Sequence, residues 1–308
     1  LSSINIPDGV TSIGDYAFQS CTSLASITFE GDAPTFGTTV FSGSDSVTVY
    51  YDSNYSGWSN NVAGRPAVQT NTFTYTLNGN STEYSVTDCL ETGSGSLDIP
   101  SIYNGLPVTS IGAQAFNSYS GLISITIPDS VTSIESSAFQ NCSGLTSINI
   151  PDSVTSIGIQ AFRGCSGLTS INIPDSVTSI GSSAFKDCSG LTSINIPDSV
   201  TSIGSSVFSY CTSLSSINIP DGVTSIGDYA FSYCESLTSI TIADGVTSIG
   251  AHVFNNCTSL SSINIPDGVT SIGDYAFNSC SVLTSITIPD GVTSIGDYAF
   301  NSCSVLTS

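Results

Sequence analysis

The sequence is poor in positive charge. Its 308 residues include only three Lys and Arg against 24 Asp and Glu, so the formal net charge at pH 7 is −21. The three cations are Arg65, Arg163 and Lys186. A surface with so few cations cannot neutralise phosphate groups, which argues against nucleic acid as a partner and against direct binding to anionic lipid.

The sequence also lacks the residues and segments that catalysis, metal binding or membrane insertion would require. No uninterrupted apolar run approaches the ~20 residues of a membrane-spanning helix, and no signal peptide is recognisable. The single histidine, His252, has no partner histidine, so we expect an exposed surface residue there. Metalloprotease, nucleotide-loop, serine-hydrolase and dinucleotide motifs are missing. We therefore expect no enzyme, no catalytic residue and no cofactor.

What the sequence does contain is a repeat of 23 residues. The stretch from Leu168 to Gly190 reads LTSINIPDSVTSIGSSAFKDCSG, and most of the chain consists of copies of it. Each copy opens with a leucine, and the regular series is Leu122, Leu145, Leu168, Leu191, Leu214, Leu237, Leu260, Leu283 and Leu306. A fixed period of this length is typical of a solenoid, in which each repeat stacks on the previous one. Because the chain starts at the first residue of a repeat and stops within another, we expect it to be a piece of a longer protein.

One repeat divides into three short sides. SINI at 170–173 alternates apolar and polar residues, as a half-buried strand does, and PDS at 174–176 is typical of a turn. VTSI at 177–180 predicts a second short strand. In AFKDC at 184–188, the apolar residues fall on one face of a single helical turn.

No coil can bury its apolar residues alone. Stacked in register at about 4.8 Å, the coils would form parallel strands and ladders of identical side chains. The sequence therefore predicts a β-rich solenoid with short parallel strands and one short helical turn per 23-residue coil.

The pattern LTSIxIPDSVTSIGxxAFxxC resembles the BspA-like leucine-rich repeat family, also called the TpLRR class. The resemblance covers most of the chain and implies a right-handed solenoid in a secreted or cell-surface protein. It also implies a role in adhesion or protein recognition, and it assigns no catalytic residue.

Interruptions of the repeat predict two arrays. We expect residues 1–68 to be the end of a first array, with Tyr55 and Trp58 in a cap over 31–64 that protects the last coil. Residues 64–70 are a candidate linker. We expect 69–308 to be a second array of about nine coils, preceded by a hairpin cap at 71–96.

Nine of the ten cysteines occupy one repeat position; Cys89 is the exception. They are Cys21, Cys142, Cys165, Cys188, Cys211, Cys234, Cys257, Cys280 and Cys303. Neighbouring coils would bring their Cα atoms within disulfide range, but parallel side chains in register are poorly aimed at one another. We favour free buried thiols that act as small apolar groups, and the spacing matches no zinc site.

Three polar columns are candidate functional surfaces. An aspartate column could bridge Ca²⁺, although one carboxylate per coil supplies few ligands and turn formation explains the aspartates better. Its candidate ligands are Asp152, Asp175, Asp198 and Asp221. The threonine column of VTSI is a weaker candidate for ice binding. The outward residues of the first strand are the candidate partner-binding face: Ser147, Asn149, Ser170, Asn172, Ser193, Asn195, Ser216 and Asn218.

The leading hypothesis is a non-enzymatic extracellular or cell-surface module for adhesion or protein interaction. Its partner would be a protein, or a matrix or glycan surface. The alternative is a self-associating structural subunit of an extracellular filament or sheath, which nearly identical repeats would suit, and ice binding is third.

Overall fold

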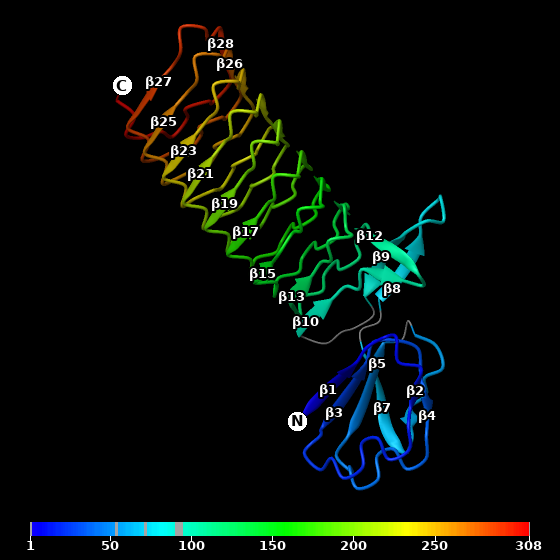
Figure 1. Cartoon of the computed structure of the whole chain (residues 1–308). Helices are drawn as coiled ribbons and strands as arrows, with labels where there is room; N and C mark the ends of the chain where they lie inside the picture. Colours follow the sequence, from blue (N-terminus) through cyan, green and yellow to red (C-terminus); the bar gives the residue numbers. More distant parts are fainter. Residues whose placement is uncertain (1, 53–54, 71–72, 90–94, 308) are drawn as a thin grey trace. The chain divides into compact units, whose positions relative to one another are not determined.

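The computed structural model describes residues 2–52, 55–70, 73–89 and 95–307. Contacts divide the chain into two units, Leu1–Thr74 with Cys89–Glu91 (unit 1) and Tyr75–Asp88 with Thr92–Ser308 (unit 2) (Figure 1). Each unit is built from coils that stack as a parallel β-solenoid with a spacing of about 23 residues, as the repeat predicts.

In unit 2, the first strands of successive coils lie side by side along one side of the solenoid (Figure 1). They are β10 (Gly95–Asp98), β13 (Leu122–Thr126), β15 (Ser147–Ile148), β17 (Ser170–Asn172), β19 (Ser193–Asn195), β21 (Ser216–Asn218), β23 (Ser239–Thr241), β25 (Ser262–Asn264) and β27 (Ser285–Thr287). Where they pair, they are parallel, and apart from a register shift at Gly95 in β10 they are in register, so that Ile171 lies opposite Ile194. Identical positions of successive coils therefore form straight columns.

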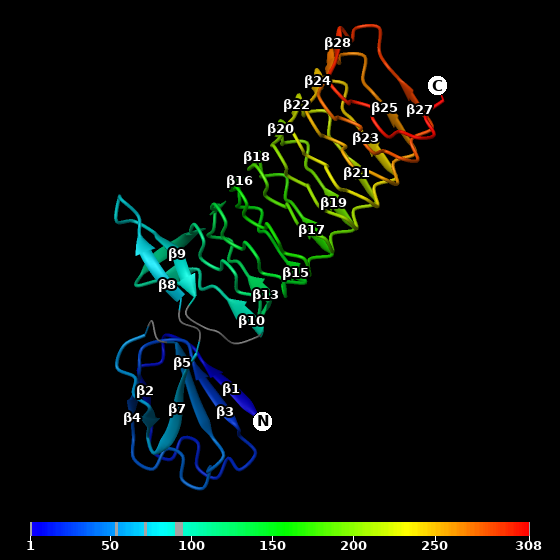
Figure 2. The same cartoon turned by 180° about the vertical axis from the view of Figure 1, so that it is seen from behind.

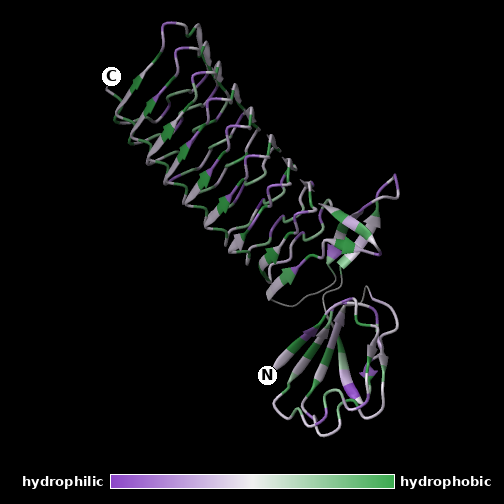
Figure 3. Cartoon of the chain, in the orientation of Figure 1, coloured by the Kyte–Doolittle hydropathy of each residue, from purple (hydrophilic) through white to green (hydrophobic). Residues whose placement is uncertain are grey.

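The second strands form another row, which Figure 2 shows from behind. They are β12 (Leu106–Ile111), β14 (Ser133–Ile134), β16 (Ser156–Ile157), β18 (Ser179–Ile180), β20 (Ser202–Ile203), β22 (Ser225–Ile226), β24 (Ser248–Ile249), β26 (Ser271–Ile272) and β28 (Ser294–Ile295). In both rows apolar and polar residues alternate along the strands (Figure 3), and most of the isoleucines are buried.

The third side of each coil is not helical, so the predicted helical turn is wrong. Ser183 and Asp187 have positive φ values of 59° and 62°, which a right-handed helix cannot contain. Amides on this side alternate between two partners: the N–H of Ala184 donates to Gly181 O within its own coil, at 3.1 Å, and the N–H of Phe162 donates to Ala184 O of the next coil, at 2.8 Å. Tight turns with bonds between coils thus replace the helix, because stacking provides partners that an isolated turn would lack.

The core of unit 2 is built around a continuous stack of phenylalanines. Phe208 is fully buried, and its ring lies 5.7 Å from that of Phe185 and 5.5 Å from that of Phe231, nearly parallel to both. The same stacking extends from Phe116 to Phe300, with centroid separations of 5.1–5.7 Å. Each interior ring therefore depends on the coils above and below it.

The cysteines are free, and seven of them are buried, as expected. Each buried thiol also donates a hydrogen bond, which the sequence did not suggest: Cys188 Sγ donates to the carbonyl oxygen of Phe162 in the previous coil, at 3.1 Å. The same contact recurs from Cys142 to Cys303 at 3.0–3.2 Å. Burial raises the pKa of Cys142, Cys188 and Cys280 to about 12.

A hairpin lies beside β12, which is the first strand of the second row in unit 2. It consists of β8 (Phe73–Leu77) and β9 (Tyr84–Cys89), and β9 pairs in parallel with β12. The short β11 (Ile102–Tyr103) pairs with β12 in the antiparallel sense. Residues 71–72 and 90–94 of the expected cap lie outside the described residues.

Unit 1 contains two rows of strands. The main sheet has the order β1 (Ser3–Ile6), β3 (Ser26–Phe29), β5 (Thr48–Asp52), β7 (Arg65–Thr70) and β6 (Asn61–Val62), and β2 (Ser12–Ile13) pairs with β4 (Thr35–Phe36). Trp58 stacks on Tyr51 at 4.9 Å and packs against Phe29, and its Nε1 donates to Gly31 O. These contacts are compatible with the cap expected over 31–64, which stays a prediction.

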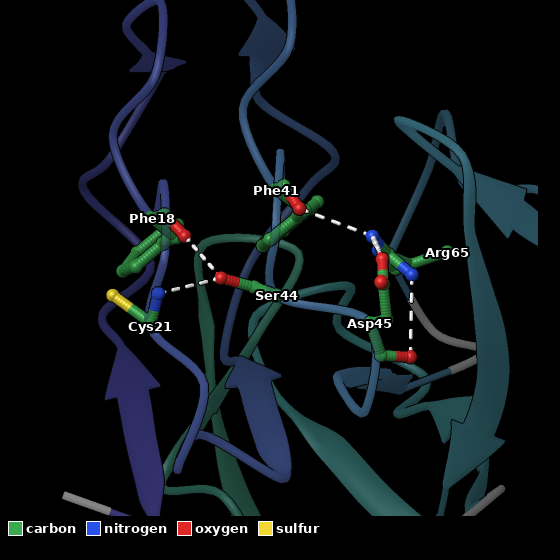
Figure 4. Close-up of polar contacts among 6 residues, drawn as sticks. All are labelled: Phe18, Cys21, Phe41, Ser44, Asp45 and Arg65. Atoms are coloured by element: carbon green, nitrogen blue, oxygen red, sulfur yellow. Dashed lines mark hydrogen bonds and ion pairs between the residues drawn. The ribbon is translucent and has the colours of Figure 1, made fainter.

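The candidate linker at 64–70 is wrong, because most of it is strand β7. This strand pairs in parallel with β5, where Ala67 lies opposite Val49. The Arg65 side chain folds back onto the preceding coil: Nη2 donates to Phe41 O at 3.0 Å and to Asp45 Oδ1 at 2.6 Å, and Nη1 donates to Asp45 O at 3.2 Å (Figure 4). The linker prediction failed because these contacts join segments 18 or more residues apart in the sequence.

Ser44 stands in unit 1 at the position that cysteine occupies in the regular coils. Its hydroxyl donates to Phe18 O at 2.6 Å and accepts from the amide of Cys21 at 2.7 Å (Figure 4). The serine therefore makes the bond to the phenylalanine carbonyl that the thiols make in unit 2.

Candidate functional site

The outward side chains of the first-strand row form a continuous polar surface, which we call the strand face. It comprises the eight residues predicted from the sequence, Ser147, Asn149, Ser170, Asn172, Ser193, Asn195, Ser216 and Asn218, and all of them are exposed. They alternate with buried isoleucines, and register pairing places Asn172 beside Asn195. The structure thus brings the predicted residues together on one flat surface, without testing whether a partner binds there.

The aspartate column lies in the turns next to the strand face. Asp152, Asp175, Asp198 and Asp221 are all exposed. The turn itself is closed by the main chain, where the amide of Val177 donates to Pro174 O at 3.0 Å. Within the described part of the chain these four carboxylates make no hydrogen bond or ion pair, so their side chains do not close the turns.

A hollow of about 570 Å³ joins the aspartate column to the strand face. It is lined by Asp129, Asp152, Asn149, Asn172 and the turn between them. Among the described residues no group of three or more His, Cys, Asp or Glu side chains is arranged to hold a metal ion. Calcium binding by the column therefore stays a prediction.

Most threonines in the column of the second strands are exposed, but several of their hydroxyls are already engaged as donors. Thr178 Oγ1 donates to the carbonyl oxygen of Thr155 in the previous coil at 3.4 Å, and Thr155 and Thr132 repeat the contact. These bonds fix the side chains and reinforce the stacking of the coils. Ice binding stays a prediction, which a thermal hysteresis measurement would test.

The turn side of the coils carries an aromatic stack that our sequence analysis missed. We call it the tyrosine row: Tyr229, His252, Tyr275 and Tyr298 lie face to face with centroid separations of 4.4–4.9 Å. A second pair, Tyr210 and Tyr233, stacks at 4.4 Å on the same side. The signal in the sequence is the spacing of 23 residues between Tyr229, His252, Tyr275 and Tyr298.

His252 is not the exposed residue that we expected. Its side chain is partly buried between the rings of Tyr229 and Tyr275, at 4.4 and 4.7 Å. Among the described residues its Nδ1 atom has no hydrogen-bond partner. The imidazole thus serves as one aromatic layer in the stack.

No helix in the described part of the chain is long and apolar enough to cross a membrane. The candidate surfaces described in unit 2 are polar columns and an aromatic row on a regular β-solenoid.

Comparison with known structures returns other leucine-rich repeat proteins. A leucine-rich repeat protein of T. pallidum (TpLRR) is 28% identical, with a TM-score of 0.44 and coverage of 77% of this chain and 88% of that one. One from Bacteroides ovatus is 26% identical, with a TM-score of 0.40 and coverage of 78% and 93%. A leucine rich cell surface protein from Faecalibacterium prausnitzii is 27% identical, with a TM-score of 0.38 and coverage of 78% and 94%.

A search of curated protein sequences finds no match to this chain. The sequence does match the BspA type leucine rich repeat region, in six copies, over residues 1–79, 95–215 and 202–308. Repeat proteins of this kind generally serve protein interaction and are generally not enzymes. With matches over nearly its whole length, the chain belongs to the BspA-type leucine-rich repeat family.

Proposed function

We propose that this chain is a non-enzymatic extracellular or cell-surface module that binds its partner through the strand face. The observation that carries the proposal is the uninterrupted column of exposed Ser and Asn side chains on a rigid row of parallel strands. The partner is a protein, or a matrix or glycan surface, bound by many weak polar contacts repeated from coil to coil.

The absence of large anchors on the strand face determines the expected mode of binding. Aromatic and Arg residues dominate the binding energy of most compact interfaces. The eight residues of the strand face are small and polar, so affinity must come from many coils acting together. Low affinity per coil and high avidity over a whole array suit an adhesion protein.

Substitution on the strand face tests the proposal. Asn172→Arg together with Asn195→Arg adds bulk and charge at the centre of the face, and we expect binding to cells or to a basement-membrane extract to fall at least tenfold. Thr178→Arg together with Thr201→Arg adds the same charge on the second-strand side of the same coils and is the matched control. Unchanged binding by the asparagine variant, or equal loss in both, would reject the strand face.

Self-association, the structural alternative, is tested separately on the purified protein. A subunit of a filament or sheath would form rods that electron microscopy resolves at high protein concentration. Isolated monomers under those conditions would count against the structural alternative and leave the adhesion proposal in place.

A further inference from the structure

The tyrosine row has an open ring face at Tyr229. Its other face stacks on His252, and the column position of the preceding coil is Ser206, whose side chain is too small to cover a phenol ring. The two coils are joined here through the Ser206 amide, which donates to Asp228 O at 2.9 Å. Tyr229 is 43% exposed, and among the described residues no other ring stacks on its open face.

Carboxylates flank the tyrosine row along its length. Asp228, Asp274 and Asp297 each precede a tyrosine of the row, and all three are exposed. Two of them also accept an amide of the next coil, since Asp228 Oδ1 accepts from Ala251 at 2.8 Å and Asp274 Oδ1 from Asp297 at 2.7 Å. These bonds hold the carboxylates in place beside the rings.

The contacts that the cations of unit 2 make are with residues outside the tyrosine row. Arg163 pairs with Asp187 at 3.2 Å, and Lys186 lies in the next coil at the same column position. Within the described residues, therefore, no ion pair reaches the carboxylates of the tyrosine row. The row is an acidic aromatic surface in a chain of net charge −21.

The neighbouring tyrosine pair shows how a cation occupies the end of such a stack. Lys186 Nζ lies 5.9 Å from the ring centroid of Tyr210, which stacks on Tyr233. An ammonium or guanidinium over an aromatic face is attracted by the negative face of the ring, and Arg forms such contacts more often than Lys. In the tyrosine row the corresponding end, at Tyr229, has no cation of the chain over it among the described residues.

We propose that the tyrosine row and its carboxylates dock a basic segment of a partner protein, with an Arg or Lys side chain over the open face of Tyr229. This surface lies on the turn side, not on the strand face, so the inference goes beyond the proposed function. Rings already held between their neighbours lose little conformational freedom on binding. Tyrosines are also enriched at interfaces, where the apolar ring and the polar hydroxyl both make contacts.

Titration of the full chain with a fluorescent nona-arginine peptide at low salt tests this inference. The double variant Tyr229→Leu with Tyr298→Leu keeps apolar bulk but removes the ring with the open face and the most exposed ring of the row, since Tyr298 is 60% exposed. Each exposed cation–π contact contributes a small factor, so the dissociation constant should rise about five- to thirtyfold. The control Thr247→Leu, on the second-strand side, should bind as the parent chain does.

Two further variants separate the aromatic and the charge contributions. Tyr229→Trp enlarges the ring face and should keep or strengthen binding, and its result stands even if the leucine variant proves unfolded by circular dichroism. Asp228→Asn with Asp297→Asn should weaken binding more than Asp152→Asn with Asp175→Asn, although each pair removes two charges. Equal losses from the two aspartate pairs, or a folded Tyr→Leu variant that binds within twofold of the parent, would overturn the proposal.

Discussion

The two units supply different hydrogen-bond donors to the same main-chain group, the carbonyl oxygen of a core phenylalanine. In unit 2 the carbonyl oxygen of each core phenylalanine accepts a bond from a thiol of the next coil, as Phe162 does from Cys188. In unit 1 the carbonyl of Phe18 accepts from the hydroxyl of Ser44, and that of Phe41 accepts from the guanidinium of Arg65. A repeated array thus uses one donor many times, whereas the irregular end of an array needs a donor of its own.

This difference bears on how each unit should respond to damage. Seven buried thiols make unit 2 sensitive to any condition that ionises sulfur. Unit 1 depends instead on one cation that is largely buried, with 17% of the Arg65 side chain exposed. Trp58, the only tryptophan of the chain, is partly buried and packs against the core of unit 1, so its fluorescence reports unfolding of that unit separately.

The largest expected effect is the alkaline unfolding of unit 2. Burial raises the thiol pKa in the fold, to about 12 for Cys188, from a reference value of 9.0. Between these two values the thiols stay protonated in the folded state but ionise in the unfolded state. Their contribution to stability is therefore fully present below pH 9 and is lost between pH 9 and about 12. For each pH unit in that window, each buried thiol lowers the free energy of unfolding by about 1.4 kcal/mol. These losses add over the coils that unfold together.

Circular dichroism melts of the full chain at half-unit steps from pH 8 to 10.5 would measure this loss. The Trp58 transition should move much less, because the equivalent buried position in unit 1 is Ser44. Cys188→Ala should reduce the pH slope by the share of one thiol. A slope that is the same for both units would show that the thiols are not its cause.

The next largest effect concerns the phenylalanine stack. Phe208→Ala leaves a cavity between Phe185 and Phe231, which should cost about 3–5 kcal/mol. Because solenoid stability is a sum of coil and nearest-neighbour terms, one weak coil can divide the array into two cooperative segments. Calorimetry should therefore show a broadened or biphasic transition for unit 2, with protease cleavage near residue 208.

Thr201→Ser, on the exposed side of the same coil, is the control and should change the melting temperature little. The Trp58 transition should be unaffected by either substitution. Equal destabilisation by both variants would mean that burial does not govern the stability of this coil.

The parts of the fold that the sequence predicted are those that one coil repeats. Leu168, Ile171 and Phe185 recur with a fixed period, so their burial and the parallel register could be read without the structure. The helical turn was wrong because spacing alone cannot distinguish a helix from tight turns such as that at Ser183, whose amides bond to the next coil. The role of Arg65 was missed because it appears once, and its contacts depend on how strand β7 folds back.

The candidate surfaces divide in the same way. The strand face follows directly from alternation along a strand, and its eight residues lie together as expected. The tyrosine row depends on how positive-φ residues such as Tyr229 and Tyr275 aim their side chains across coils. That direction requires the backbone of the turns, for which spacing alone predicts a helix.

The smallest expected effect concerns the donor that ends the array in unit 1. Arg65→Met keeps much of the side-chain length but removes the bonds to Phe41 O and Asp45, leaving a half-buried carbonyl without this partner. Phe41 O keeps its bond from the Ser44 amide, at 3.0 Å, so the cost is that of one hydrogen bond from a charged donor, about 1.5–3 kcal/mol. The Trp58 transition should therefore shift to lower temperature, while the main transition of unit 2 stays in place.

Asp45→Asn is the control: the Asp45 side chain is 85% exposed, so weakening its ion pair should cost under about 1 kcal/mol. If Arg65→Met melts no lower than Asp45→Asn, the surface ion pair rather than the carbonyl contact explains the role of Arg65, and the parallel between Arg65 and the thiols of unit 2 is wrong.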